Sequence, residues 1–348
     1  VGSKSEGVTI GPEWMTTGMR GMVQNPVYFR DVRVTKSLNL LSSGDMPGRA
    51  IAERIIQVPR WGLLTTYVGM LKRAVQIGTR FAARRTIVTG RLLDNVITSA
   101  QINEWSVIVD VMELGVILIA KAWDEGRDMP IEMLAALKSW ASESIGQVMD
   151  RLVQLLGGRG FCDTNIVGQM WRDARVFRIF EGATEALWVY LGFVYTKSPQ
   201  VFSSYFSSVV SNNSLNSSMV ADIAKVSAII QDKKVAHLFK DSNMSVDQWL
   251  GYKIGELVSL YVVHGTVVAS ASSVQPDRYN VYVAWCKAQI ETRLATCNAL
   301  PPALLTLQNS ARTQVTAWDY ETDIGRIGGG YNPENEVCMA TLQPKLLS

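Results

Sequence analysis

The sequence predicts a mainly α-helical protein that begins with a short β segment. Apolar residues recur at three- and four-residue spacings from Gly48 to Leu156, a period typical of helices with one buried face. The alternating run Val27–Val34 is instead typical of a strand. A chain of 348 residues, 47% of them hydrophobic and 19% charged, is able to bury a substantial core and is not intrinsically disordered.

The first segment, 1–47, is predicted to be the remnant of a larger β-domain. Gly, Pro, Val, Tyr and Phe are frequent between Val8 and Val34, as expected for short strands and turns. Two or three strands need another element to cover their hydrophobic face. We therefore expect this segment to be the end of a β-domain that is otherwise absent from the chain.

The segment 48–197 is predicted to form a helical bundle. We expect a long helix that follows Pro59, a second that carries the most apolar stretch, a third that ends at Gly157, and a shorter pair. Each has one broad apolar face that must be covered, which favours antiparallel packing. The predicted ranges are 61–85, 95–125, 131–156 and, for the pair, 166–195.

The remaining chain is predicted to be a linker followed by an additional helical region. The stretch 198–218 is rich in Ser and Asn and is expected to lack the apolar periodicity needed for packing. The region 219–348 follows it and ends in an irregular tail around Gly328–Pro333. The helices expected in this region are 219–241, 246–273 and 277–300.

Composition excludes several classes of function. A formal charge of +3 is too small to indicate nucleic-acid binding. The stretch Val107–Ala120 contains two carboxylates and is too short to cross a membrane, so it predicts a buried helix. The four cysteines lack CxxC spacing and the two histidines are far apart, so no metal site is predicted and reduced thiols are expected. These residues are Cys162, Cys286, Cys297, Cys338, His237 and His264.

Two motifs follow one another in the second half of the bundle. The first, Gln154–Phe161, reads Gln-Leu-Leu-Gly-Gly-Arg-Gly-Phe, and the second, Arg172–Gly182, reads Arg-Asp-Ala-Arg-Val-Phe-Arg-Ile-Phe-Glu-Gly. A glycine cluster after a helix is by itself most often a turn with positive φ. In this order and spacing the two motifs resemble the carboxy-terminal half of the acyl-CoA dehydrogenases, of the very-long-chain type that includes a complex I assembly-factor relative.

Other segments extend this resemblance over nearly the whole chain. Tyr28–Val34 is similar to the strand that closes the family's middle β-domain, and Arg60 stands where the family has an arginine opening its long helix. Met244–Ser273 and Trp285–Lys287 resemble the extra helical region of the very-long-chain branch. The resemblance therefore implies an acyl-CoA dehydrogenase bundle with a β remnant before it and an additional helical region after it.

The resemblance also implies roles for particular residues. Glu181 matches the catalytic base, because a carboxylate is able to remove the α proton of an acyl-CoA. Arg60 matches a substrate-binding position. FAD is shared across a dimer in this family, and the matching cofactor-binding positions are Arg85, Gln154, Gly157, Gly158, Gly160 and Gly182.

Three residues depart from the family pattern. Ala183 replaces a threonine whose hydroxyl would bond the cofactor, Glu185 adds a negative charge near the expected diphosphate, and Val88 replaces an aromatic residue. The amino-terminal helical domain and most of the β-domain are also expected to be missing, which would leave Glu181 in contact with water.

These observations favour a degenerate family member that serves as a structural or assembly subunit of a mitochondrial complex. The alternative is an active FAD-dependent long-chain acyl-CoA dehydrogenase whose amino-terminal half is not in this chain. A third interpretation is a module that binds a lipid or thioester without turnover. In each case we expect a family-like homodimer or heterodimer in the mitochondrial matrix, with long-chain acyl-CoA as the substrate if the protein is active.

Overall fold

The computed structural model describes residues 2–34, 48–231 and 246–298. The chain divides into two compact units, Val1–Ile229 with Asp247–Asn298 and Ile230–Val246 with Ala299–Ser348, and the sites below belong to the first. His237, Cys338 and the predicted tail beyond residue 300 lie outside the described residues.

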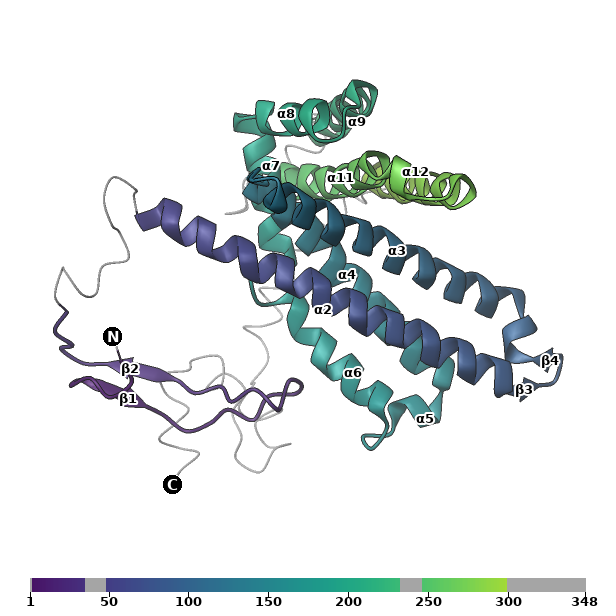
Figure 1. Cartoon of the computed structure of the whole chain (residues 1–348), viewed down its shortest axis with the longest axis horizontal. Helices are drawn as coiled ribbons and strands as arrows, with labels where there is room; N and C mark the ends of the chain where they lie inside the picture. Colours follow the sequence, from purple (N-terminus) through teal and green to yellow (C-terminus); the bar gives the residue numbers. More distant parts are fainter. Residues whose placement is uncertain (1, 35–47, 232–245, 299–348) are drawn as a thin grey trace, which may run out of the picture. The chain divides into compact units, whose positions relative to one another are not determined.

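The described chain is mainly α-helical, as predicted, and its centre is a bundle of long helices (Figure 1). α2 and α4 run in the same direction and pack directly against each other, and α3 runs in the opposite direction along α2. The bundle contains α2 (Gly48–Arg84), α3 (Val96–Asp124), α4 (Ile131–Leu156), α5 (Gly158–Phe161), α6 (Ile166–Arg175), the 3-10 turn η2 (Val176–Arg178) and α7 (Thr184–Lys197).

α2 begins earlier than the sequence predicted. A start after Pro59 was expected, yet the helix begins at Gly48 and contains Pro59 within it. Proline cannot donate to the carbonyl of Ile55, which removes one helical hydrogen bond. Ile55 and Val58 are exposed on this turn, so water is able to satisfy the free carbonyl.

The limits of α3 and α4 agree with the prediction, and local chemistry explains them. The side chain of Asn95 accepts hydrogen bonds from the backbone N–H groups of Ile97 and Thr98 and begins α3. Gly157 ends α4 with a φ of 60°. Ile108 and Met112 are buried, as expected for an apolar stretch in a core helix. Among the helices that the structure describes, none is long and apolar enough to cross a membrane.

Two small hairpins accompany the bundle. β1 (Val8–Ile10) and β2 (Val27–Phe29) are antiparallel, with Val8 opposite Phe29 and Ile10 opposite Val27. The backbone N–H of Met19, in the loop between these strands, donates to the Asp173 carboxylate of α6 at 2.6 Å. β3 (Thr86–Ile87) and β4 (Gly90–Arg91) form a tight turn, and the 3-10 turn η1 (Leu92–Asp94) leads from it into α3.

The stretch 198–218 packs, contrary to the prediction that it could not. It contains α8 (Gln200–Ser208) and the start of α9 (Asn213–Gln231). Phe202, Tyr205 and Phe206 are buried in α8. The Ser and Asn residues occupy mainly the exposed face, where short polar side chains do not oppose helix packing. Composition alone therefore concealed a helix whose apolar residues are few but large.

The last described helices are α11 (Val246–Ala269) and α12 (Pro276–Asn298), joined by the 3-10 turn η4 (Ala271–Ser273). α11 packs against α7 at very short range, because a Cβ on Gly192 would collide with the backbone of Gly251 and one on Gly255 with the carbonyl of Trp188. The hydroxyls of Ser139 and Ser259 also meet at 3.1 Å across the α4–α11 contact. The additional helices are thus a packed part of this unit.

Candidate active site

The predicted base lies in a turn between η2 and α7. Glu181 has a φ of 54° and Gly182 a φ of 99°. Glycine adopts such angles freely, but a glutamate in the left-handed region is strained by roughly 1–2 kcal/mol. Strained residues of this kind persist where the surrounding structure holds them, and they are concentrated at functional sites.

Two buried cations hold this turn through its carbonyl groups. Lys138 of α4 is fully buried, and its Nζ donates to the carbonyl oxygens of Phe180 at 2.8 Å and Gly182 at 2.7 Å. Arg60 of α2 is also buried, and its Nε donates to the Glu181 carbonyl at 3.3 Å. Three successive carbonyls thus receive hydrogen bonds from two different helices, which fixes the backbone of Glu181.

Burial and charge set the protonation of these cations. The pKa of Lys138 is lowered to about 8, chiefly by desolvation and then by the nearby Arg60 charge, while the Glu181 carboxylate acts in the opposite direction. Desolvation likewise lowers the pKa of Arg60, and Glu181 partly offsets this effect. The base therefore lies within the electrostatic field of both cations.

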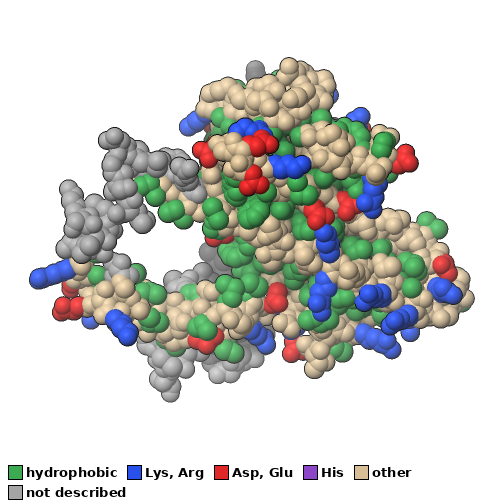
Figure 2. All heavy atoms as spheres, in the orientation of Figure 1, with side chains coloured by type: hydrophobic (Ala, Val, Ile, Leu, Met, Phe, Trp, Pro, Cys, Tyr) green, Lys and Arg blue, Asp and Glu red, His purple; other side chains and the backbone are tan. Residues whose placement is uncertain are grey.

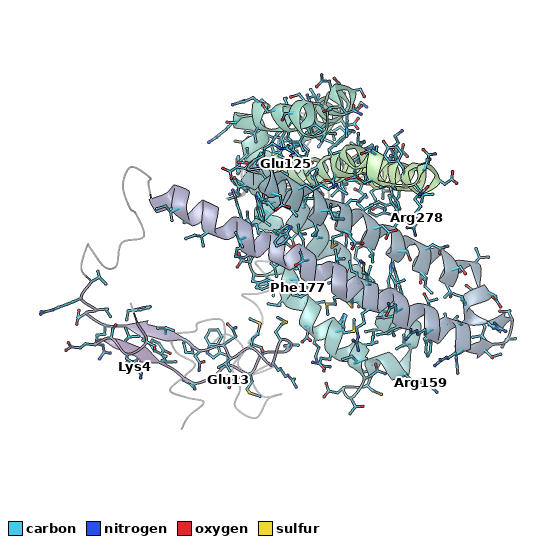
Figure 3. All side chains as sticks on the ribbon, in the orientation of Figure 1. Lys4, Glu13, Glu125, Arg159, Phe177 and Arg278 are labelled. Carbon is cyan, nitrogen blue, oxygen red and sulfur yellow. The ribbon has the colours of Figure 1, made fainter. Side chains whose placement is uncertain are left out.

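Aromatic side chains pack together just before the Glu181 turn and against α2. The rings of Tyr67 and Phe177 are 4.5 Å apart, and those of Phe177 and Phe180 stack at 5.8 Å. Phe177, labelled in Figure 3, lies beside α2. Arg178 pairs with Glu143 of α4 at 3.0 Å, and its guanidinium packs where a Cβ on Gly146 would lie. This set of contacts ties η2 to the bundle on both sides of Phe177.

The residues just after the base differ in what they contribute. A Cβ on Gly182 would lie 2.8 Å from Leu187, and the positive φ also requires glycine there. Ala183 is the N-cap of α7 and offers no side-chain hydrogen bond. Thr184 is fully buried, and its hydroxyl has no hydrogen-bond partner among the described residues. The start of α7 consequently lacks the hydroxyl cap that a threonine at 183 would provide.

The predicted glycine turn has a different construction. Gly157 needs its positive φ, and Gly160 is buried, with its α carbon so close to Val153 that an added Cβ would lie 2.7 Å from that carbonyl. Gly158 has neither constraint, since it is exposed and open space surrounds the position of a Cβ. The positive φ explains Gly157 and packing explains Gly160, whereas Gly158 leaves its backbone open to a bound molecule.

The base and the glycine turn lie near opposite ends of α4. Lys138 contacts the Glu181 turn, and Gln154 comes about 24 Å further along, at roughly 1.5 Å of rise per residue. α2 runs parallel to α4, because Arg60 also meets the Glu181 turn and Gly78 packs against Leu152. The end of α2, with Arg85, therefore lies toward the same end as the glycine turn.

The surface around the glycine turn is basic and partly apolar. Figure 2 shows Lys and Arg side chains gathered over the end where Figure 1 places α5, β3 and β4. Arg85 and Gln154 are exposed there, and so are Val88 and Phe161. The exposed arginines at this end of the bundle are Arg80, Arg84, Arg85, Arg91 and Arg159. Such a surface suits an anionic partner with an apolar portion.

Comparison with known proteins identifies the bundle. A model of the acyl-CoA dehydrogenase carboxy-terminal domain matches residues 47–191. Residues 47–191 are an acyl-CoA dehydrogenase carboxy-terminal domain. The match begins just before α2 and ends within α7, so the acyl-CoA dehydrogenase domain contains both Glu181 and the glycine turn.

Sequence relatives are similar over about half of this chain. The very long-chain specific acyl-CoA dehydrogenase of Mus musculus is 30% identical over 182 residues, which is 52% of this chain and 27% of that protein. The caffeyl-CoA reductase–Etf complex subunit CarC of Acetobacterium woodii is 28% identical over 183 residues, or 52% of this chain and 47% of CarC. The chain thus spans between about a quarter and a half of the length of these two relatives.

Solved structures share the fold. The acyl-CoA dehydrogenase complexed with FAD from Bacillus anthracis has a TM-score of 0.64 at 17% identity, over 91% of this chain and 61% of that chain. Butyryl-CoA dehydrogenase from Megasphaera elsdenii has a TM-score of 0.51 at 22% identity, over 56% and 50% of the two chains. The predicted fold class is confirmed.

The structure separates the predicted site residues into two groups. Arg60, Glu181 and Gly182 come together in one site, and the other predicted residues lie toward the far end of α4. Sequence reasoning missed Lys138, although a lysine at a buried phase of an amphipathic helix was a readable signal. Among the described residues no cluster of three His, Cys, Asp or Glu side chains could hold a metal ion. The functional roles of all these residues remain predictions.

Proposed function

We propose that this chain supplies the base and a large part of the flavin site of an FAD-dependent acyl-CoA dehydrogenase. The observation that carries the proposal is the strained backbone of Glu181, which buried Arg60 and Lys138 hold in place. Glycine would occupy the same turn without strain. A glutamate there makes physical sense if its carboxylate is needed at that point.

A site for FAD at the glycine turn is supported by the open backbone of Gly158 and by exposed Gln154 and Arg85 toward the same end of the bundle. These three residues would contact the cofactor, and the basic surface around them would favour its diphosphate. FAD supplies a hydride acceptor when it is bound. Glu181 takes the α proton of the acyl thioester onto a carboxylate oxygen, and the two buried cations hold the backbone from which that carboxylate extends.

A Glu181→Gln substitution tests the role of the base. Glutamine keeps the size of the side chain and the polar backbone contacts but cannot accept the proton. We expect acyl-CoA oxidation to fall by a factor of about 10² or more, because a general base contributes that much, while FAD absorbance and thermal stability are unchanged. Oxidation that persists in the variant would overturn the assignment of Glu181.

A Gly158→Ala substitution tests the flavin surface separately. The fold has room for this methyl group, so stability should be retained. We expect weaker FAD retention, measured by flavin absorbance after gel filtration. Gln169→Ala on the exposed face of α6 is the matched control and should bind as wild type does. Equal FAD retention in both variants would remove Gly158 from the site.

The second candidate is a structural or assembly subunit that has lost catalysis. Ala183 caps α7 without a hydroxyl, and Val88 is a fully exposed aliphatic residue at the tip of the β3–β4 turn. A purified full-length protein that carries no flavin and oxidises no long-chain acyl-CoA would favour this candidate. A mitochondrial location is supported by the mitochondrial very long-chain specific acyl-CoA dehydrogenases of Mus musculus and Bos taurus, whereas the Acetobacterium woodii relative is bacterial.

A further inference from the structure

The loop between β1 and β2 docks on the last turns of α6. Its residues 16–22, called the strap below, contain a tight turn in which the Met22 N–H donates to the Met19 carbonyl at 2.9 Å. A Cβ on Gly18 would lie 2.3 Å from the carbonyl oxygen of Arg172. Only a glycine allows the two backbones to approach this closely. The strap is therefore shaped to dock at this place.

One carboxylate fastens the strap against backbone strain. Met19 has a φ of 54°, a conformation that is strained for a methionine. Its N–H donates to Oδ1 of Asp173 at 2.6 Å, and an ionised acceptor makes this hydrogen bond stronger than a neutral one would. Within the described residues no other hydrogen bond joins the strap to the bundle. Asp173 thus stabilises a docked state that the strain of Met19 opposes.

Arg172 extends from the strap toward the glycine turn. Its carbonyl meets Gly18, and its Nη1 pairs with Oδ1 of Asp163 at 2.8 Å. A Cβ on Gly168 would lie 3.6 Å from Nη1 of Arg172 and 3.3 Å from the carbonyl oxygen of Gly160. The Arg172 guanidinium therefore lies beside the segment that ends the glycine turn, while its backbone touches the strap.

A further hydrogen bond continues these contacts to Gly158. Sγ of Cys162 donates to the Gly158 carbonyl at 3.2 Å, and Asp163 follows Cys162 directly in the chain. Gly158 has the open backbone that supports the proposed FAD site. Consecutive contacts through α6 and Asp163 thus join the strap to that site.

We propose that the strap and the FAD site close together. Asp173 is the positioning residue that fastens the strap, and the Arg172–Asp163 pair then holds the glycine turn in the shape that receives FAD. Bound FAD in turn stabilises the docked strap, because a coupling between two sites acts equally in both directions. The coupling rests on the proposed FAD site, whereas the fastening of the strap by Asp173 does not.

Limited trypsin digestion of the full chain without FAD tests the fastening. Arg20 is exposed within the strap, and cleavage after it reports how often the strap leaves the bundle, with cleavage after exposed Arg33 as the internal reference. We expect Asp173→Ala to raise the rate at Arg20 by about tenfold, because it removes a hydrogen bond to a charged group.

Two control variants separate this effect from a general loss of structure. Asp173→Asn keeps an acceptor for the Met19 N–H and should restore a rate within about threefold of wild type. Asp150→Ala removes an exposed carboxylate of α4 and should leave the rate unchanged. Thermal denaturation shows whether each variant is folded. Equal cleavage after Arg20 in wild type and Asp173→Ala would overturn the proposal.

The same digestion with saturating FAD tests the coupling. We expect FAD to slow cleavage after Arg20 in wild type by about fivefold or more, as for other coupled sites. Asp163→Ala removes an exposed side chain and should leave the strap fastened but abolish this protection. Asp173→Ala should also weaken FAD binding.

The outcomes distinguish the coupling from the FAD site itself. If wild type binds FAD but its cleavage after Arg20 is unchanged, the coupling is wrong and the proposed FAD site stands. If wild type binds no FAD, both the site and the coupling are wrong, and the digestion without FAD still decides whether Asp173 fastens the strap.

Discussion

The two ends of α4 illustrate two ways of building a functional turn. At the Glu181 turn, buried cations from α2 and α4 bind three successive carbonyls, and the strained residue cannot hold its conformation alone. At the glycine turn, Gly157 adopts its positive φ without strain and the neighbouring backbone is exposed. The first turn is organised by distant parts of this chain, whereas the second is organised locally and leaves its surface open.

The largest test of this contrast is Lys138→Met. Methionine fills a similar volume but leaves the carbonyls of Phe180 and Gly182 buried without donors. We expect the free energy of unfolding to fall by about 2–5 kcal/mol in urea denaturation. Lys121→Met, at the exposed end of α3, is the control and should change the free energy of unfolding by less than about 0.5 kcal/mol. Equal stability of the two variants would mean that Lys138 does not hold the turn.

The pH dependence of stability gives the next effect. The pKa of Lys138 is lowered by burial to about 8 in the folded protein, so between pH 8 and 10.5 the unfolded chain binds more protons. The contribution of this group to stability is therefore present above pH 10.5 and is lost as the pH falls through 8. As the pH rises from 8 to 10.5, the free energy of unfolding of wild type should increase by up to about 3 kcal/mol relative to that of Lys138→Met. Parallel pH profiles would contradict the lowered pKa.

The glycine turn is tested by a pair of alanine substitutions. Gly160→Ala places a methyl group against the Val153 carbonyl and should destabilise the protein by about 1–3 kcal/mol. Gly158→Ala meets open space and should change stability by less than about 1 kcal/mol, in the stabilising direction. Thermal denaturation of both variants measures the difference. A large loss of stability in Gly158→Ala would show that the fold also requires glycine at this position.

The smallest expected effect concerns the start of α7. Ala183 is the N-cap and offers no side-chain acceptor, so Ala183→Ser should stabilise the protein by about 0.5–1 kcal/mol. Urea denaturation measures this gain. Ala186→Ser, within the first turns of the same helix and exposed, is the control and should be neutral or slightly destabilising. If Ala186→Ser were stabilised and Ala183→Ser were not, residue 183 would not be the position that lacks a capping side chain.

Local chemistry made much of the fold predictable. Asn95 and Gly157 mark the limits of α3 and α4 because capping and positive φ depend on adjacent residues. Two expectations failed where packing overrode composition. α2 tolerates Pro59 because the Ile55 carbonyl, which proline cannot hydrogen-bond, lies on an exposed turn where water is able to satisfy it. The stretch 198–218 folds because three aromatic side chains bury one face of α8.

The sequence by itself determined the helical architecture, the identity of the acyl-CoA dehydrogenase domain and the positions of Glu181 and the glycine turn. These depend on periodicity and on motifs that are contiguous in the chain. Only the tertiary structure decided that Lys138 and Arg60 hold the base, and that Asp173 binds the loop between β1 and β2. Those contacts join residues far apart in sequence, and the choice among the possible partners of a buried charge is made by packing.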